Sequence, residues 1–167
     1  MDAFFLMIES SAPSIWLRES PSLLAFPLTL IFHTLGLAFL VGTCVAVCGR
    51  VLGLASAVPL SSLERYEMVM WLGFWVNAIS GVALLVAYPT KALTNPYFYV
   101  KLALIAAALI SVAPVWRCVR REVIQPGTAV PLRVRVAAGA TLVCWAGSIT
   151  VGRFLAYTYT RLTVEFP

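Results

Sequence analysis

The chain has 167 residues, of which 61% are hydrophobic and only 11% are charged, with a net charge of +5. Soluble domains carry roughly 25% charged residues, so this chain lacks the side chains needed to cover a water-facing surface. We therefore expect a single-domain, all-α integral membrane protein, and we exclude nucleic-acid binding because no soluble face remains to carry a basic stripe.

The first 20 residues are apolar in short runs that cannot cross a bilayer. Residues 4–8 form one such run, which Pro13 ends, and Trp16 belongs to the next. Short amphipathic segments with tryptophan lie in the membrane surface, so we predict an interfacial N-terminal segment of one or two short helices over residues 1–20. Asp2 stands where a signal peptide would be basic, so we do not expect cleavage.

Four longer apolar stretches follow, each close to the 20 or so residues that span a bilayer core as a helix. Asn95 and Pro96 suit the N-cap and first position of the third helix. Short connections, including a polar turn at residues 125–127, favour an up-down-up-down four-helix bundle. We assign this transmembrane domain to residues 21–160 and a tail to 161–167. The predicted spans cover residues 23–48, 66–88, 97–116 and 134–158.

Basic residues are unequally divided between the two ends of the predicted bundle. One end holds a smaller group of three basic residues, Arg18, Lys91 and Arg161, and the other end holds a larger group of seven. Because Lys and Arg are retained on the cytoplasmic side, we predict a multi-pass protein of the bacterial inner membrane with both termini on the periplasmic or outer side. The larger group, which this orientation places in the cytoplasm, consists of Arg50, Arg65, Arg117, Arg120, Arg121, Arg133 and Arg135.

Each predicted span carries one strongly polar residue, and polar groups inside a membrane are costly and usually functional. Counting about 1.5 Å per residue places His33 and Asn77 near mid-membrane. Lys101 and Arg153 fall closer to the outer surface. The four together predict a pocket in the outer half of the bundle, with a neutral base at its floor and two cations at its rim.

Such a pocket suits a flat apolar ligand with acidic groups, and haem b is the clearest example. The imidazole of His33 would ligate the iron, while Lys101 and Arg153 would pair with the propionates. A quinone or an organic anion fits the same pattern. Structural roles remain open beside these: His33 and Asn77 as hydrogen-bonding groups between helices, and the two cations as side chains that reach the headgroups.

Three sequence segments resemble a group of small bacterial membrane proteins that includes the copper-resistance D-like proteins and the four-helix membrane protoporphyrinogen oxidases. The segment HTLGLAFLVG, from His33 to Gly42, is similar to their first helix. The sequence YVKLAL, with Lys101, is similar to the opening of a later helix, and residues 71–81 lie where the group has a glycine-containing second helix. The chain also resembles an uncharacterised bacterial four-helix family that shares ESP before the first span and NPxFYVKLAL at the third.

This resemblance implies haem b at His33 and a contribution of Lys101 to activity. The chain has no second histidine, so a partner subunit, a second protomer or an open coordination site would complete the ligation. Our leading hypothesis is a haem b-binding protein that transfers electrons, acting with quinone, in a larger redox complex or as an oxidoreductase similar to the protoporphyrinogen oxidases. The alternatives are a non-catalytic membrane anchor or assembly subunit, and a transporter of a metal or small organic anion. We expect the protein to form a homo-oligomer or to bind partner membrane subunits in the lipid bilayer.

Overall fold

The structure is a computed structural model that describes residues 2–124 and 129–162. These residues form helices joined by short loops, without strands. Four helices among them are long and apolar enough to cross a membrane, so the chain is a multi-pass helical membrane protein. The elements are α1 (Asp2–Glu9), α2 (Ala12–Glu19), α3 (Phe26–Leu52), η1 (Leu60–Leu63), α4 (Tyr66–Ala87), α5 (Pro89–Leu93), α6 (Pro96–Ile124) and α7 (Leu132–Leu162).

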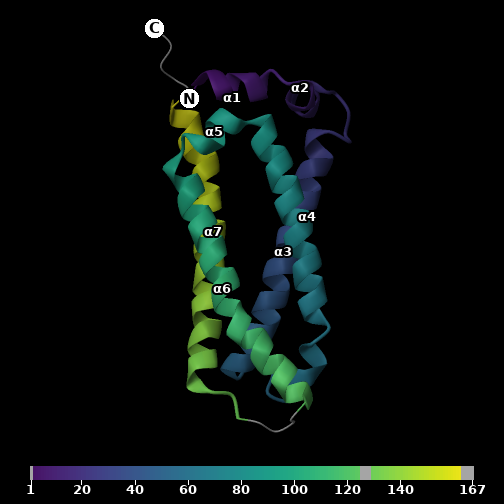
Figure 1. The fold of residues 1–167 in the computed structure, drawn as a ribbon, viewed down its shortest axis with the longest axis vertical. Coiled ribbons are helices and arrows are strands. Elements are labelled where there is room, and N and C mark those ends of the chain that lie inside the picture. Colours follow the sequence, from purple (N-terminus) through teal and green to yellow (C-terminus); the bar gives the residue numbers. More distant parts are fainter. Residues whose placement is uncertain (1, 125–128, 163–167) are drawn as a thin grey trace.

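The four long helices form two antiparallel pairs, α3 with α4 and α6 with α7 (Figure 1). The pairs meet at the end of the molecule that holds η1, where α6 leans toward α3 and α4, and they diverge toward the end that holds α1 and α2. The main hydrophobic cluster lies at the η1 end. Its buried residues begin at Leu40 in α3 and at Ala108 in α6, and in the antiparallel helices they extend no further than Met70 in α4 and Trp145 in α7. Packing between the pairs is therefore concentrated in one half of the bundle.

The pair α3 and α4 is held together by a very close backbone contact at Gly36 and Gly73. A Cβ atom at Gly36 would lie 2.6 Å from the backbone nitrogen of Asn77, and one at Gly73 would lie 2.7 Å from the backbone nitrogen of Leu40. Small residues allow membrane helices to approach this closely, and van der Waals packing then stabilises the pair. The contact fixes α3 against α4 within one turn of both His33 and Asn77.

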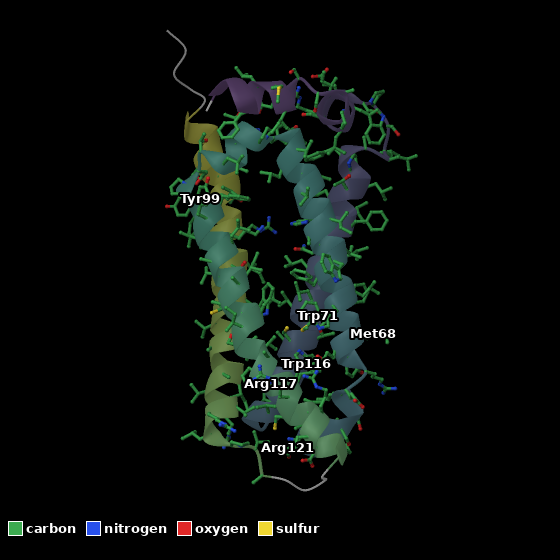
Figure 2. The ribbon with its side chains drawn as sticks, viewed as in Figure 1. Met68, Trp71, Tyr99, Trp116, Arg117 and Arg121 are labelled. Atoms are coloured by element: carbon green, nitrogen blue, oxygen red, sulfur yellow. The ribbon has the colours of Figure 1, made fainter. Side chains whose placement is uncertain are left out.

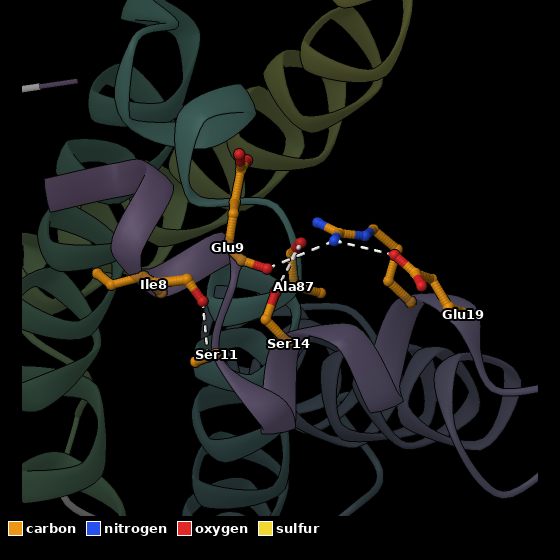
Figure 3. A network of polar contacts seen from close by, with 7 residues as sticks. Ile8, Glu9, Ser11, Ser14, Glu19 and Ala87 are labelled. Carbon is orange, nitrogen blue, oxygen red and sulfur yellow. Dashed lines mark hydrogen bonds and ion pairs between the residues drawn. The ribbon is translucent and has the colours of Figure 1, made fainter. Parts of the chain in front are cut away.

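The short helices α1 and α2 lie across the diverging ends of the two pairs (Figure 1). α1 contacts α5, and α2 contacts α4. The hydroxyl of the fully buried Ser14 donates to the carbonyl oxygen of Ala87 at 3.5 Å (Figure 3). Leu17 packs with Ala25 and Ala87 in a second small apolar cluster. The N-terminal segment thus covers the end of the bundle at which the two helix pairs diverge and which the main hydrophobic cluster does not reach.

The observed helices differ from the predicted spans mainly at their ends. α3 continues past residue 48 to Leu52, where Gly53 adopts the left-handed conformation (φ 107°) that ends a helix. α6 continues eight residues beyond the predicted end at residue 116, because arginine is a good helix former. Arg120 also forms an ion pair with Glu67 of α4 that holds this extension. The predicted turn at residues 125–127 and most of the tail at 161–167 lie outside the described residues.

The start of α6 confirms the prediction of an N-cap at Asn95. Its Oδ1 atom accepts a hydrogen bond from the backbone nitrogen of Tyr97 at 3.0 Å, and its Nδ2 atom donates to the hydroxyl of Thr158 at 3.1 Å. We expect Asn95→Ala to lower the free energy of unfolding by about 1–2 kcal/mol. Asn95→Asp keeps the capping oxygen and should lose less. Unfolding midpoints in detergent would check this order, and equal losses in the two variants would contradict the capping role.

Candidate functional site

His33 lies in the half of the bundle where the two helix pairs diverge, and it faces α4. Its Nδ1 atom is 3.0 Å from the carbonyl oxygen of Asn77 and 3.1 Å from the hydroxyl of Ser80. The Asn77 side chain returns the contact, since its Nδ2 atom donates to the carbonyl oxygen of His33 at 2.7 Å. His33 and Asn77 are therefore joined by reciprocal hydrogen bonds between α3 and α4.

These contacts assign the proton on the imidazole ring of His33. The carbonyl oxygen of Asn77 can only accept, so Nδ1 carries the hydrogen that is donated to it. The Ser80 hydroxyl lies 2.6 Å from the carbonyl of Val76 and donates there, which leaves its oxygen free to accept from Nδ1 as well. In the neutral ring Nε2 is then the unprotonated nitrogen, and it makes no hydrogen bond within the described part of the chain. A neutral imidazole oriented in this way is ready to bind a metal through Nε2.

Lys101 approaches the same region from the other helix pair. Its side chain runs along Gly152 of α7: a Cβ atom there would lie 3.7 Å from Cε and 3.8 Å from Nζ of Lys101. The ammonium group is close enough to the His33 imidazole to interact with it electrostatically. Within the described ranges it has no hydrogen-bond or ion-pair partner. The two pairs thus bring into one region a ring nitrogen and a cation that have no partner in the part of the chain that the structure describes.

The structure brings three of the four predicted site residues together and leaves the fourth apart. His33 and Asn77 are in contact, and Lys101 lies near His33. Arg153 follows Gly152 on α7, but its side chain is exposed and forms no polar contact with the other three. One residue along an α-helix turns the side chain by about 100°, so Arg153 lies on a different face of α7 from the one at which Gly152 meets Lys101.

Three residues of this region were missed by the sequence analysis: Ser80, Gly81 and Gly152. A Cβ atom at Gly81 would lie 3.2 Å from Cε1 of His33, so glycine leaves room for the ring. Ser80 and Gly81 follow Asn77 by three and four residues, and this spacing places them near it on the same face of a helix. That signal was present in the sequence, whereas nothing in it paired Gly152 with Lys101.

The chemical character of the site is that of a neutral nitrogen ligand next to an uncompensated positive charge. No acidic residue occurs between Glu67 and Glu122, and none between Glu19 and Glu64. No group of three or more His, Cys, Asp or Glu side chains that could enclose a metal ion occurs among the residues described. A bare metal ion therefore lacks a ligand set here, while a metal within an anionic organic ligand would need only the imidazole and the cation.

Comparison with known proteins adds no relative: no protein-family model matches the sequence, and no curated protein or solved structure matches it either.

Proposed function

We propose that the chain is a haem b-binding membrane protein that takes part in electron transfer, with His33 as an axial ligand of the haem iron. The observation that carries this proposal is the orientation of the imidazole, whose Nδ1 atom is hydrogen-bonded to the Asn77 carbonyl and whose Nε2 atom has no hydrogen-bond partner among the described residues. Histidines that ligate metals usually donate their other ring nitrogen to a carbonyl or carboxylate, which fixes the ring and raises its basicity.

The electrostatics of the site support an anionic ligand of this kind. Lys101 contributes a positive charge near His33. The four long helices contain only two carboxylates, Glu67 and Glu122, and both lie at the η1 end, away from this charge. A haem propionate would supply the missing negative charge and accept hydrogen bonds from the ammonium group. Arg153 lies one residue beyond Gly152 and belongs to the proposal as a second cation for an exposed propionate or for a quinone oxygen.

The two helix pairs offer a place for a flat apolar group. They pack tightly from Leu40 and Trp145 toward the η1 end, while His33 and Lys101, on opposite pairs, are only half buried. A macrocycle between the pairs would bury these side chains and replace the missing core. When bound, haem supplies one-electron chemistry. In the proposal, Asn77 and Ser80 orient His33, Lys101 supplies a positive charge, and α1 and α2 exclude water from the open end of the bundle.

The proposed place of the protein is the bacterial inner membrane, with the η1 end in the cytoplasm. All seven arginines of that end support this orientation, and it puts α1, α2 and the His33 site on the periplasmic half. The chain supplies one imidazole, so the second axial position is left to a partner subunit, a second copy of the chain or an exchangeable ligand. We propose that the bound haem would exchange electrons with a quinone in the membrane.

An absorption spectrum tests the proposal most directly. Detergent-purified protein titrated with haemin should develop a Soret band that saturates near one haem per chain, and dithionite should convert it to a reduced b-type spectrum. Haemin in the same detergent without protein is the necessary control, because haem also enters empty micelles. A spectrum identical to that of the control, together with colourless protein from haem-replete cells, would overturn the proposal and leave the membrane-anchor function.

A further inference from the structure

A hollow of about 370 Å³ lies at the η1 end of the molecule, between the last turns of α6 and the first turn of α7. Pro114, Cys118 and Val134 contribute apolar wall, and Val134 is buried. Three arginines line the same hollow: Arg117, Arg121 and Arg133. It lies far along α6 from Lys101 and takes no part in the site described above.

The arginines of this hollow outnumber the acidic residues among the described residues that line it. Arg117 and Arg121 are four residues apart, so they share one face of α6, and Figure 2 shows both near the η1 end of that helix. Arg133 joins them from α7, and Glu122 is the single acidic residue among the described residues that line the hollow. Neither a hydrogen bond nor an ion pair engages any of these three guanidinium groups within the described ranges.

Other arginines at the same end are already used within the protein. Arg120 pairs with Glu67, the guanidinium of Arg50 donates to the carbonyl oxygen of Val58, and that of Arg135 donates to the carbonyl oxygen of Leu52. The three arginines of the hollow differ from these because all three line one cavity. Guanidinium groups that line one cavity and find no acceptor among the described residues suit a group that offers several anionic oxygens, such as a phosphate.

The position of the hollow along α6 indicates where in the membrane it lies. Arg117 is 21 residues from Pro96, the first residue of α6, which corresponds to about 32 Å of helix. A bilayer core is about 30 Å thick, so the arginines reach the headgroup level when the start of α6 lies at the opposite surface. Pro114 then lies just inside the hydrocarbon layer, which provides an apolar wall below the charges.

We propose that this hollow binds the headgroup of an anionic phospholipid, with the phosphodiester between the three arginines and the acyl chains against the apolar wall toward Pro114. A soluble phosphate shares the headgroup chemistry, but it makes no use of a wall that continues into the membrane. Basic pockets between transmembrane helices on the cytoplasmic side are a recognised way of holding such lipids. The proposal does not depend on haem binding at His33.

Lipid titration of the delipidated full-length protein in detergent tests this site. Phosphatidylglycerol should bind at least about tenfold more tightly than phosphatidylcholine, and salt should weaken the preference. The double variant Arg121→Gln/Arg133→Gln should lose the preference. Arg65→Gln is the matched control, since Arg65 is exposed at the same end but does not line the hollow, and it should keep the wild-type preference within about twofold.

The outcomes separate a lipid from a free anion and from a general charge effect. Glycerol phosphate at the same concentration should fail to displace phosphatidylglycerol. Displacement at equal affinity would show a site for soluble anions and overturn the lipid assignment. Equal binding of the two lipids, a preference that survives in the double variant, or an equal loss in Arg65→Gln would each overturn the site itself.

Discussion

Replacing Gly36 by valine should separate α3 from α4 and lower the free energy of unfolding by about 3 kcal/mol or more. A Cβ atom at this position would lie 2.6 Å from the backbone nitrogen of Asn77 and 2.9 Å from the carbonyl oxygen of Gly73. Both neighbours are backbone atoms, so no side-chain rotation relieves the clash and the helices themselves must move. That movement would also break the hydrogen bonds between His33 and Asn77.

Gly42→Val is the matched control for this prediction. Gly42 lies on the same helix and is exposed, and no atom outside its own turn lies within 4 Å of the place that a Cβ atom would take. Valine and glycine differ little in helix propensity, so this variant should remain within about 0.5 kcal/mol of the wild type. The midpoints of unfolding in mixed detergent and dodecyl sulfate micelles would compare the two. Equal midpoints would show that the Gly36 contact does not hold the pair together.

The positions of the helices followed from simple signals in the sequence, whereas their ends required the tertiary structure. Pro96 behind Asn95 marks the beginning of α6 because a capping side chain and a fixed φ both favour that position. The charged residues that begin at Arg117 predict the end of this helix at residue 116, but charge does not stop a helix, and α6 continues to Ile124. The pair of Arg120 with Glu67 comes from another helix, and such a contact cannot be read from a local pattern.

The depth of the candidate site was predictable, but its geometry was not. Counting residues along each span brings His33 and Asn77 to the same level, and the structure joins them. Their contact depends on how α3 crosses α4 at Gly36 and Gly73, and the residue count along each span gives no information about that crossing. Arg153 shows the same limit: depth placed it with Lys101, while the rotation of α7 exposes it and turns Gly152 toward Lys101.

Replacing His33 by glutamine should abolish the Soret band while leaving the bundle folded. The glutamine amide can still donate a hydrogen bond toward the carbonyl oxygen of Asn77, so the link between α3 and α4 is retained in part. It offers no imidazole nitrogen to the iron, so ligation from this chain is lost. The variant therefore separates the metal-binding role of His33 from its role as a hydrogen-bonding group between helices.

The control for this variant is the adjacent residue. Thr34 is exposed, and its hydroxyl donates only to the carbonyl oxygen of Leu30 in its own helix, so Thr34→Ala should bind haem as the wild type does. Absorption spectra of haemin titrations, with circular dichroism to verify helix content, would compare the variants. Because the chain has a single histidine, a Soret band that persists in folded His33→Gln would mean that haem associates with the protein or micelle without imidazole ligation. The uncompensated charge of Lys101 would then have to be explained by an anion that carries no metal.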